Sequence, residues 1–100
     1  MELFKFKINL DVSNFKTENV TNMKGMFSLS SNLKNLDVKN FKTDKVTDMS
    51  YMFNECSNLI NLDVSNFNTE NVKFFENMFF NCPMVNKIKN LKNFKNLIDA

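Results

Sequence analysis

The feature that most constrains this chain is an internal repeat of 26 residues. The hexapeptide Leu-Asp-Val-Ser-Asn-Phe at residues 10–15 returns at 36–41, with Lys in place of Ser, and again at 62–67. The rest of each unit keeps the same register without a gap. A unit this short cannot bury its own apolar side, so identical units bury it by stacking on one another. The repeat therefore predicts a solenoid.

Each unit contains one segment typical of a strand and one typical of a helix. In the second unit Leu36 and Val38 alternate with Asp37 and Lys39, as in a half-buried strand with its apolar side chains inward. Valine, methionine and phenylalanine then recur at helix-like spacing, as over residues 46–53. We therefore expect an α/β fold. It is a leucine-rich-repeat-like solenoid of three coils of about 26 residues, with a parallel sheet on one side and short helical or 3₁₀ turns opposite.

The whole chain of 100 residues is predicted to form one repeat domain. Its parts are the repeats at residues 10–35, 36–61 and 62–87, an N-terminal flank at 1–9 and a C-terminal segment at 88–100.

The final segment carries apolar residues at loosely helical spacing, which predicts a C-terminal helical cap over residues 88–100. Phe74 and Phe80 fall in columns that are polar in the other units. Apolar side chains at outward positions near the end of a stack need a cover, so we expect the cap to lie over them.

Composition removes several classes of function. The chain contains no His, and a net charge of +2 is too small to predict a nucleic-acid partner. No apolar stretch approaches the roughly 18–20 residues of a membrane-spanning helix. Nothing in the sequence resembles a nucleophile–base pair, a phosphate-binding loop or a metal cluster. We therefore expect no enzyme activity, no catalytic residue, no cofactor and no metal.

The outward side of the predicted sheet is the candidate partner-binding face. One aspartate of each unit lies on this face, and the column they form consists of Asp11, Asp37 and Asp63. We expect this column to be a solvated polar surface, and the alternative is a binding strip for Ca²⁺ or another cationic ligand. The residues of the candidate face are Asp11, Ser13, Lys34, Asp37, Lys39, Asp63 and Ser65. The outward asparagines Asn9, Asn35 and Asn61 belong to the same surface.

An asparagine column and a pair of cysteines are also expected inside the stack. Strand alternation places one asparagine of each unit inward, where stacked amides would bond each other and the turn backbone. These residues are Asn14, Asn40 and Asn66. Cys56 and Cys82 lie one repeat apart. We expect them to be buried free thiols, with a disulfide between adjacent coils as the alternative.

The repeat Leu-Asp-Val-Ser-Asn-Phe-x-Thr-x-x-Val-Thr-x-Met-x-x-Met-Phe resembles the BspA-like leucine-rich repeat of bacterial surface proteins, which is abundant in mycoplasma lipoproteins. The resemblance covers about residues 9–87. The repeat departs from the usual leucine-rich pattern because Asn14 and its equivalents arrive one position earlier. The resemblance implies a solenoid carried on a bacterial cell surface, with adhesion or binding as its role.

Two functions are therefore expected for the chain. The first is a surface module that binds a host or neighbouring cell-surface protein or glycan through its sheet face. The second is a structural spacer, or a repeat cassette detached from a longer lipoprotein, with no ligand of its own. Self-association through the ends of the stack is a further expectation, because a terminal strand offers unpaired backbone groups.

The resemblance predicts a cell-surface or extracellular location. The opening residues 1–7 have neither a long apolar run nor a small-residue cleavage site, so they show no export signal. A cytoplasmic location, or a fragment of a longer protein, is the alternative.

Overall fold

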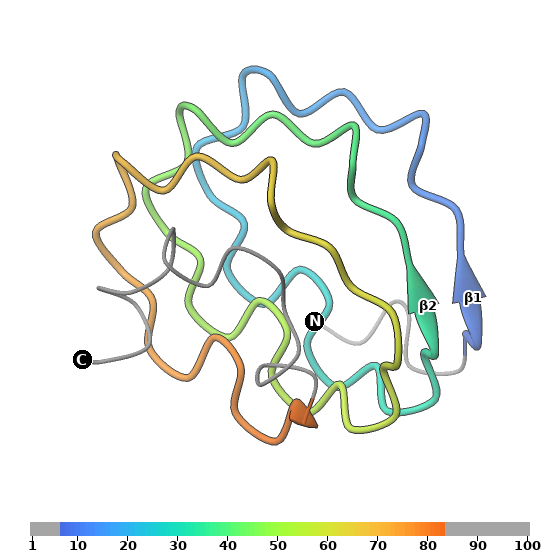
Figure 1. Ribbon diagram of the computed structural model, residues 1–100. Coiled ribbons are helices and arrows are strands. Elements are labelled where there is room, and N and C mark those ends of the chain that lie inside the picture. Colours follow the sequence, from blue (N-terminus) through green and yellow to red (C-terminus); the bar gives the residue numbers. More distant parts are fainter. Residues whose placement is uncertain (1–6, 84–100) are drawn as a thin grey trace.

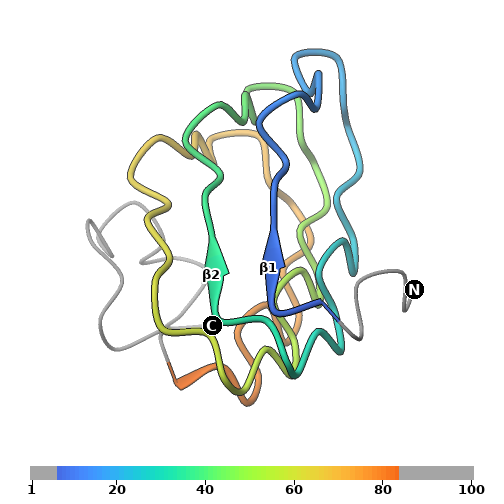
Figure 2. The ribbon, with the colours of Figure 1, turned by 90° about the vertical axis from the view of Figure 1, so that its right-hand side faces the viewer.

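The computed structural model describes residues 7–83. Here the chain winds through successive turns that lie side by side, and we name residues 10–35, 36–61 and 62–83 coil 1, coil 2 and coil 3 (Figure 1). Strand β1 (Asn9–Leu10) pairs in parallel with β2 (Asn35–Leu36). A further parallel bridge joins Asn35 to Asn61, so the third coil continues this side of the molecule (Figure 2).

A second row of parallel bonds holds the opposite side of the coils. The Thr47 N–H donates to the Thr21 carbonyl at 2.8 Å, and the Lys73 N–H donates to the Thr47 carbonyl at 2.7 Å. Parallel bridges join Asp48 to Asn22 and to Phe74 on the same side. The residues joined by these bonds and bridges are 26 positions apart, so equivalent residues of successive coils lie next to each other.

The predicted helical or 3₁₀ turns are replaced by consecutive hydrogen-bonded turns, and residues 46–53 contain no helix. Alternate N–H groups of this side donate to the next coil, for example from Met49 to the Phe74 carbonyl at 2.8 Å. The intervening N–H groups close short turns within their own coil. For example, the Met52 N–H donates to the Met49 carbonyl at 3.2 Å. A helix would need the same N–H groups for carbonyls within its own coil. Bonding between coils therefore takes the place of the helix.

Each turn segment contains residues of positive φ at the same two places in every coil. The first place is held by Gly25, Tyr51 and Asn77, with φ of 65°, 59° and 51°. The second is held by Leu29, Glu55 and Asn81, with φ of 65°, 63° and 54°. Each of them is the third residue of a hydrogen-bonded turn, the position where a type II turn requires positive φ. Gly and Asn adopt this conformation with little strain, so coil 3 meets the requirement best.

The core lies between the two rows of bonds and contains the predicted Met and Phe positions. Leu36 and Val38 are buried while Asp37 and Lys39 are exposed, as the alternation predicts. The strand is shorter than the pattern suggests. Asp37 Oδ1 accepts a hydrogen bond from the Lys39 N–H at 3.0 Å, which turns the backbone directly after Leu36.

Stacked phenylalanine rings connect the coils through this core. One column has ring centroids 6.4 Å apart at both steps, and the other has 5.7 and 5.5 Å. The two columns are Phe15–Phe41–Phe67 and Phe27–Phe53–Phe79. Such pairs add roughly 0.5–1.5 kcal/mol each beyond the area they bury.

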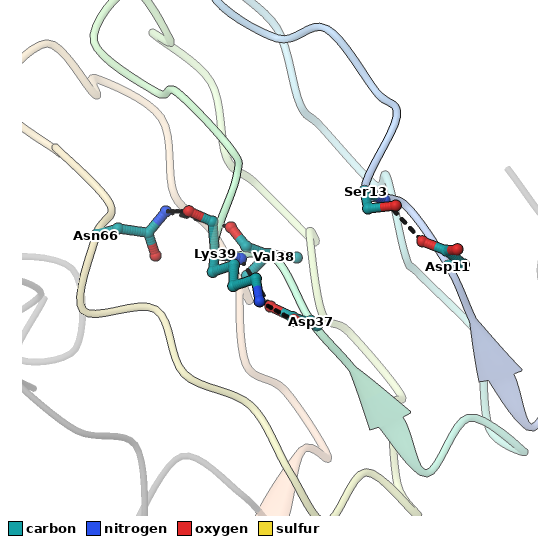
Figure 3. Close-up of polar contacts among 6 residues, drawn as sticks. All are labelled: Asp11, Ser13, Asp37, Val38, Lys39 and Asn66. Atoms are coloured by element: carbon teal, nitrogen blue, oxygen red, sulfur yellow. Dashed lines mark hydrogen bonds and ion pairs between the residues drawn. The ribbon is translucent and has the colours of Figure 1, made fainter.

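The prediction that Asn14, Asn40 and Asn66 point inward is wrong, because all three side chains are exposed. The strand alternation stops early, since the Phe41 N–H closes a turn on the Val38 carbonyl at 3.0 Å. The exposed Asn66 amide still bonds the turn backbone. Its Nδ2 donates to the carbonyls of Val38 and Lys39 at 3.2 and 3.1 Å (Figure 3). The same Nδ2 lies 3.0 Å from the Phe41 carbonyl, to which it also donates.

The outward positions of Phe74 and Phe80 agree with their polar columns, because these side chains are 59% and 52% exposed. The predicted cap at residues 88–100 falls outside the described residues. Among residues 7–83, no helix is long and apolar enough to cross a membrane.

The buried Thr43 hydroxyl links coil 2 to coil 3 through two hydrogen bonds. Its Oγ1 accepts from the Asn68 N–H at 2.7 Å and donates to the Asn68 carbonyl at 2.9 Å. Thr17 Oγ1 accepts from the Lys42 N–H at 2.7 Å, so the first of these two bonds also joins coil 1 to coil 2.

Replacing Thr43 with the isosteric Val should lower the free energy of unfolding by about 2 kcal/mol, because it leaves the Asn68 N–H and carbonyl without this partner. Thr43→Ser keeps the hydroxyl and should cost about 1 kcal/mol for the lost methyl. Urea denaturation measures both values. An equal loss in the two variants would contradict the bridging role of the hydroxyl.

Candidate partner-binding face

The residues predicted to bind a partner lie together on one surface, the outward side of β1, β2 and the adjoining segment of coil 3 around Asn61. We call this surface the strand face. Six of the seven predicted residues are exposed there, and Ser65 is half-buried. The six are Asp11, Ser13, Lys34, Asp37, Lys39 and Asp63.

A ladder of asparagine amides crosses the strand face. The Asn35 amide Nδ2 donates to Asn9 Oδ1 at 3.0 Å, and the Asn61 Nδ2 donates to Asn35 Oδ1 at 2.6 Å. Stacked amides were predicted for the column of Asn40, but they occur at the strand residues instead, where the parallel pairing holds the side chains in line. An amide has two N–H donors and two acceptor lone pairs. Each rung therefore keeps bonding capacity that a ligand can use.

The acidic column has a structural task as well as an exposed position. Asp11, Asp37 and Asp63 each accept, through Oδ1, the N–H of the residue two positions later, at 2.9, 3.0 and 2.9 Å. These bonds form Asx turns that end the strands. The second oxygen of Asp37 lies 3.7 Å from Lys39 Nζ (Figure 3). Among residues 7–83, no cluster of three or more His, Cys, Asp or Glu side chains could hold a metal ion.

Hydrogen bonding lowers the pKa of Asp11. The largest cause is the hydrogen bond from the Ser13 side chain, and the Ser13 backbone N–H adds to it (Figure 3). Both stabilise the charged carboxylate. In coil 2 the residue at the position of Ser13 is Lys39, which provides a charge instead of a hydroxyl.

Two exposed isoleucines on the strand face were missed by the sequence analysis. Ile8 and Ile60 are 54% and 59% exposed, and they occupy the column of Lys34. The backbone confirms this column, because the Lys34 N–H donates to the Ile8 carbonyl and the Ile60 N–H to the Lys34 carbonyl. The repeat contained the signal. Since Lys34 was predicted to point outward, residues one repeat before and after it had to do the same.

A shallow hollow of about 370 Å³ lies over the paired strands. Both its polar and its apolar walls come from repeated columns of the strand face. The lining residues are Asn9, Leu10, Asp11, Asn35, Leu36, Asp37 and Asn61. A hollow of this kind can accept a small part of a partner while its polar walls fix orientation.

The cysteines lie in the core, away from the strand face. Cys56 and Cys82 are both buried thiols that form no disulfide, which agrees with the preferred prediction. Burial, with a smaller contribution from Cys82, raises the pKa of the Cys56 thiol to about 12. The thiol donates to the Phe27 carbonyl at 3.1 Å and is therefore protonated and unsuited to nucleophilic chemistry at neutral pH.

Comparison with known proteins identifies a family for this repeat. A family model described as "Mycoplasma protein of unknown function, DUF285" matches residues 1–100. The chain belongs to the DUF285 family. This agrees with the expected mycoplasma repeat family. No curated protein and no solved structure matches this DUF285 chain.

The Asp11 carboxyl should titrate below its ordinary value of 3.8, and Ser13→Ala should raise its pKa toward that value. The hydrogen bonds to the Asp11 carboxylate stabilise the folded state above the ordinary pKa of the carboxyl. This contribution is lost as the pH falls through the lowered pKa of the folded state. Carboxyl-carbon NMR across an acid titration measures both, with Asp11→Asn assigning the resonance. An unchanged Asp11 pKa in Ser13→Ala would show that the hydroxyl does not act on this carboxylate.

Proposed function

We propose that this chain is a BspA-like, leucine-rich-repeat-like solenoid that acts as a non-enzymatic binding module at the cell surface. Its strand face would bind a protein or glycan of a host or neighbouring cell. The regular offset between bonded coils supports the solenoid, since equivalent residues pair across β1, β2 and Asn61. The family description supports only the mycoplasma origin of the repeat. The binding role rests on the strand face itself.

The observation that carries this proposal is the mixture of exposed apolar and polar columns on one face. Ile8 and Ile60 remain more than half exposed beside the polar amide ladder. Exposed apolar side chains rimmed by polar groups are typical of an interaction surface. A partner could bury the exposed side chains of Ile8 and Ile60. The shallow hollow over the paired strands could receive a protruding group of the same partner.

The polar groups of the face determine which partner chemistry fits. The ladder asparagines offer unpaired N–H groups and lone pairs, which suit peptide groups or sugar hydroxyls. The outer oxygens of the acidic column accept hydrogen bonds or face cationic side chains. Lys34 adds a positive charge between the two isoleucines.

The alternative is a structural spacer without a ligand of its own. It is supported by the Asx turns, since Asp11, Asp37 and Asp63 each have a role within the fold. The amide ladder likewise stabilises the pairing of coils. A regular polar face would then follow from stacking alone.

Binding of the labelled chain to intact host cells, immobilised matrix proteins and a glycan array separates the two functions. The informative variant is Asp11→Asn/Asp37→Asn/Asp63→Asn, because Asn keeps the Asx-turn acceptor while removing the charge. The binding module predicts saturable binding that this variant weakens about tenfold, from about 0.5 kcal/mol per exposed charge.

The matched control removes another acidic column, one residue per coil, away from the strand face: Glu18→Gln/Asp44→Asn/Glu70→Gln. It should bind as the unmodified chain does. Equal losses in the two triple variants would argue against a specific strand-face site. Absence of saturable binding to any of these partners would favour the spacer.

A further inference from the structure

Within residues 7–83, the first and last coils present complementary rows of backbone groups. We call the side of the coils opposite the paired strands, which contains the consecutive turns, the turn side. On the turn side of coil 2, the backbone carbonyls of Asp48 and Ser50 accept hydrogen bonds from coil 1. The equivalent carbonyls of coil 1 accept no hydrogen bond within residues 7–83. These carbonyls belong to Asn22, Lys24, Met26 and Ser28. Alternate carbonyls over residues 22–28 of coil 1 therefore form a row of acceptors that coil 2 does not use.

Coil 3 ends in the matching donors. The N–H groups of Met49 and Tyr51 in coil 2 donate to coil 3. Their equivalents in coil 3, on Phe75 and Asn77, donate to no acceptor in the described part of the chain, and the same holds for Asn81. The two ends lie at opposite sides of the row of coils (Figure 1). Acceptors at one end and donors at the other permit only a head-to-tail contact.

Side chains at the two ends are complementary as well. Lys24, Ser50 and Glu76 occupy one column, so its exposed end members carry opposite charges. Across residues 10–83 this is the one column whose ends differ in sign. Phe74 and Phe80 lie on the same edge as Glu76, and both are more than half exposed.

From this geometry we infer that copies of this chain associate head to tail, the turn-side edge of coil 3 (residues 73–81) docking on that of coil 1 (residues 21–29). The contact repeats the bonding that already joins coil 1 to coil 2, with Glu76 of one copy beside Lys24 of the next. Exposed Phe74 and Phe80 side chains lose exposed area in the contact. The like-charged column of Glu18, Asp44 and Glu70 shows that stacking tolerates exposed repulsion.

A charge swap tests this contact in the full chain. Sedimentation velocity across a wide concentration range should show reversible association of the unmodified chain. Lys24→Glu and Glu76→Lys each place like charges at the junction, so each should lower the association constant roughly threefold to tenfold. An equimolar mixture of the two variants restores opposite charges at every junction between unlike copies. It should associate more strongly than either variant alone and within about twofold of the unmodified chain at the same total concentration, because each copy finds compatible partners at half that concentration.

Lys42→Glu is the matched control, because it makes the same charge change at an exposed position of the middle coil. It should leave association unchanged. Circular dichroism verifies that each variant is folded, and the two single variants probe opposite ends independently. A chain that stays monomeric at every concentration, or a mixture that associates no better than its components, would overturn the inference. Strand-face binding does not depend on either result.

Discussion

Register between coils is the constraint on which the rest of this structure depends. Each coil lacks enough core of its own, so its backbone groups and rings must meet their equivalents in the next coil. Hydrogen bonds at a 26-residue offset fix this register on both sides of the molecule. The phenylalanine columns and the Thr43 bridge follow from it, since like residues come to lie side by side.

The sequence predicted which residues occupy equivalent positions in successive coils, but it did not predict the backbone conformation of the turns. Column membership follows directly from the period, so Leu36 and Val38 were placed in the core correctly. The helix-like spacing misled because apolar residues three and four apart also face one side of a chain of type II turns. The positive φ of Tyr51 is what such a turn needs, yet tyrosine gives no hint of it. Local propensity therefore yielded to bonding between coils.

At the candidate site, too, the positions of the residues could be predicted but the local backbone geometry could not. The outward positions of Asp11, Asp37 and Asp63 could be predicted, but their Asx turns depend on backbone geometry that alternation does not encode. The amide ladder appeared at Asn35 and not at Asn40 because the strand ends between them. A regular stack thus makes structural and binding roles coincide on the same side chains. Only substitutions that preserve the turn, such as Asp to Asn, separate those roles.

The most direct test of the stacked register is contact between the aromatic rings of successive coils. Nuclear Overhauser spectra of the phenylalanine-labelled chain should show ring-to-ring contacts from Phe53 to both Phe27 and Phe79, whose centroids lie 5.7 and 5.5 Å away. Phe53→Leu assigns these signals by removing them. Rings of Phe27 and Phe79 that contact only their sequence neighbours would contradict the account.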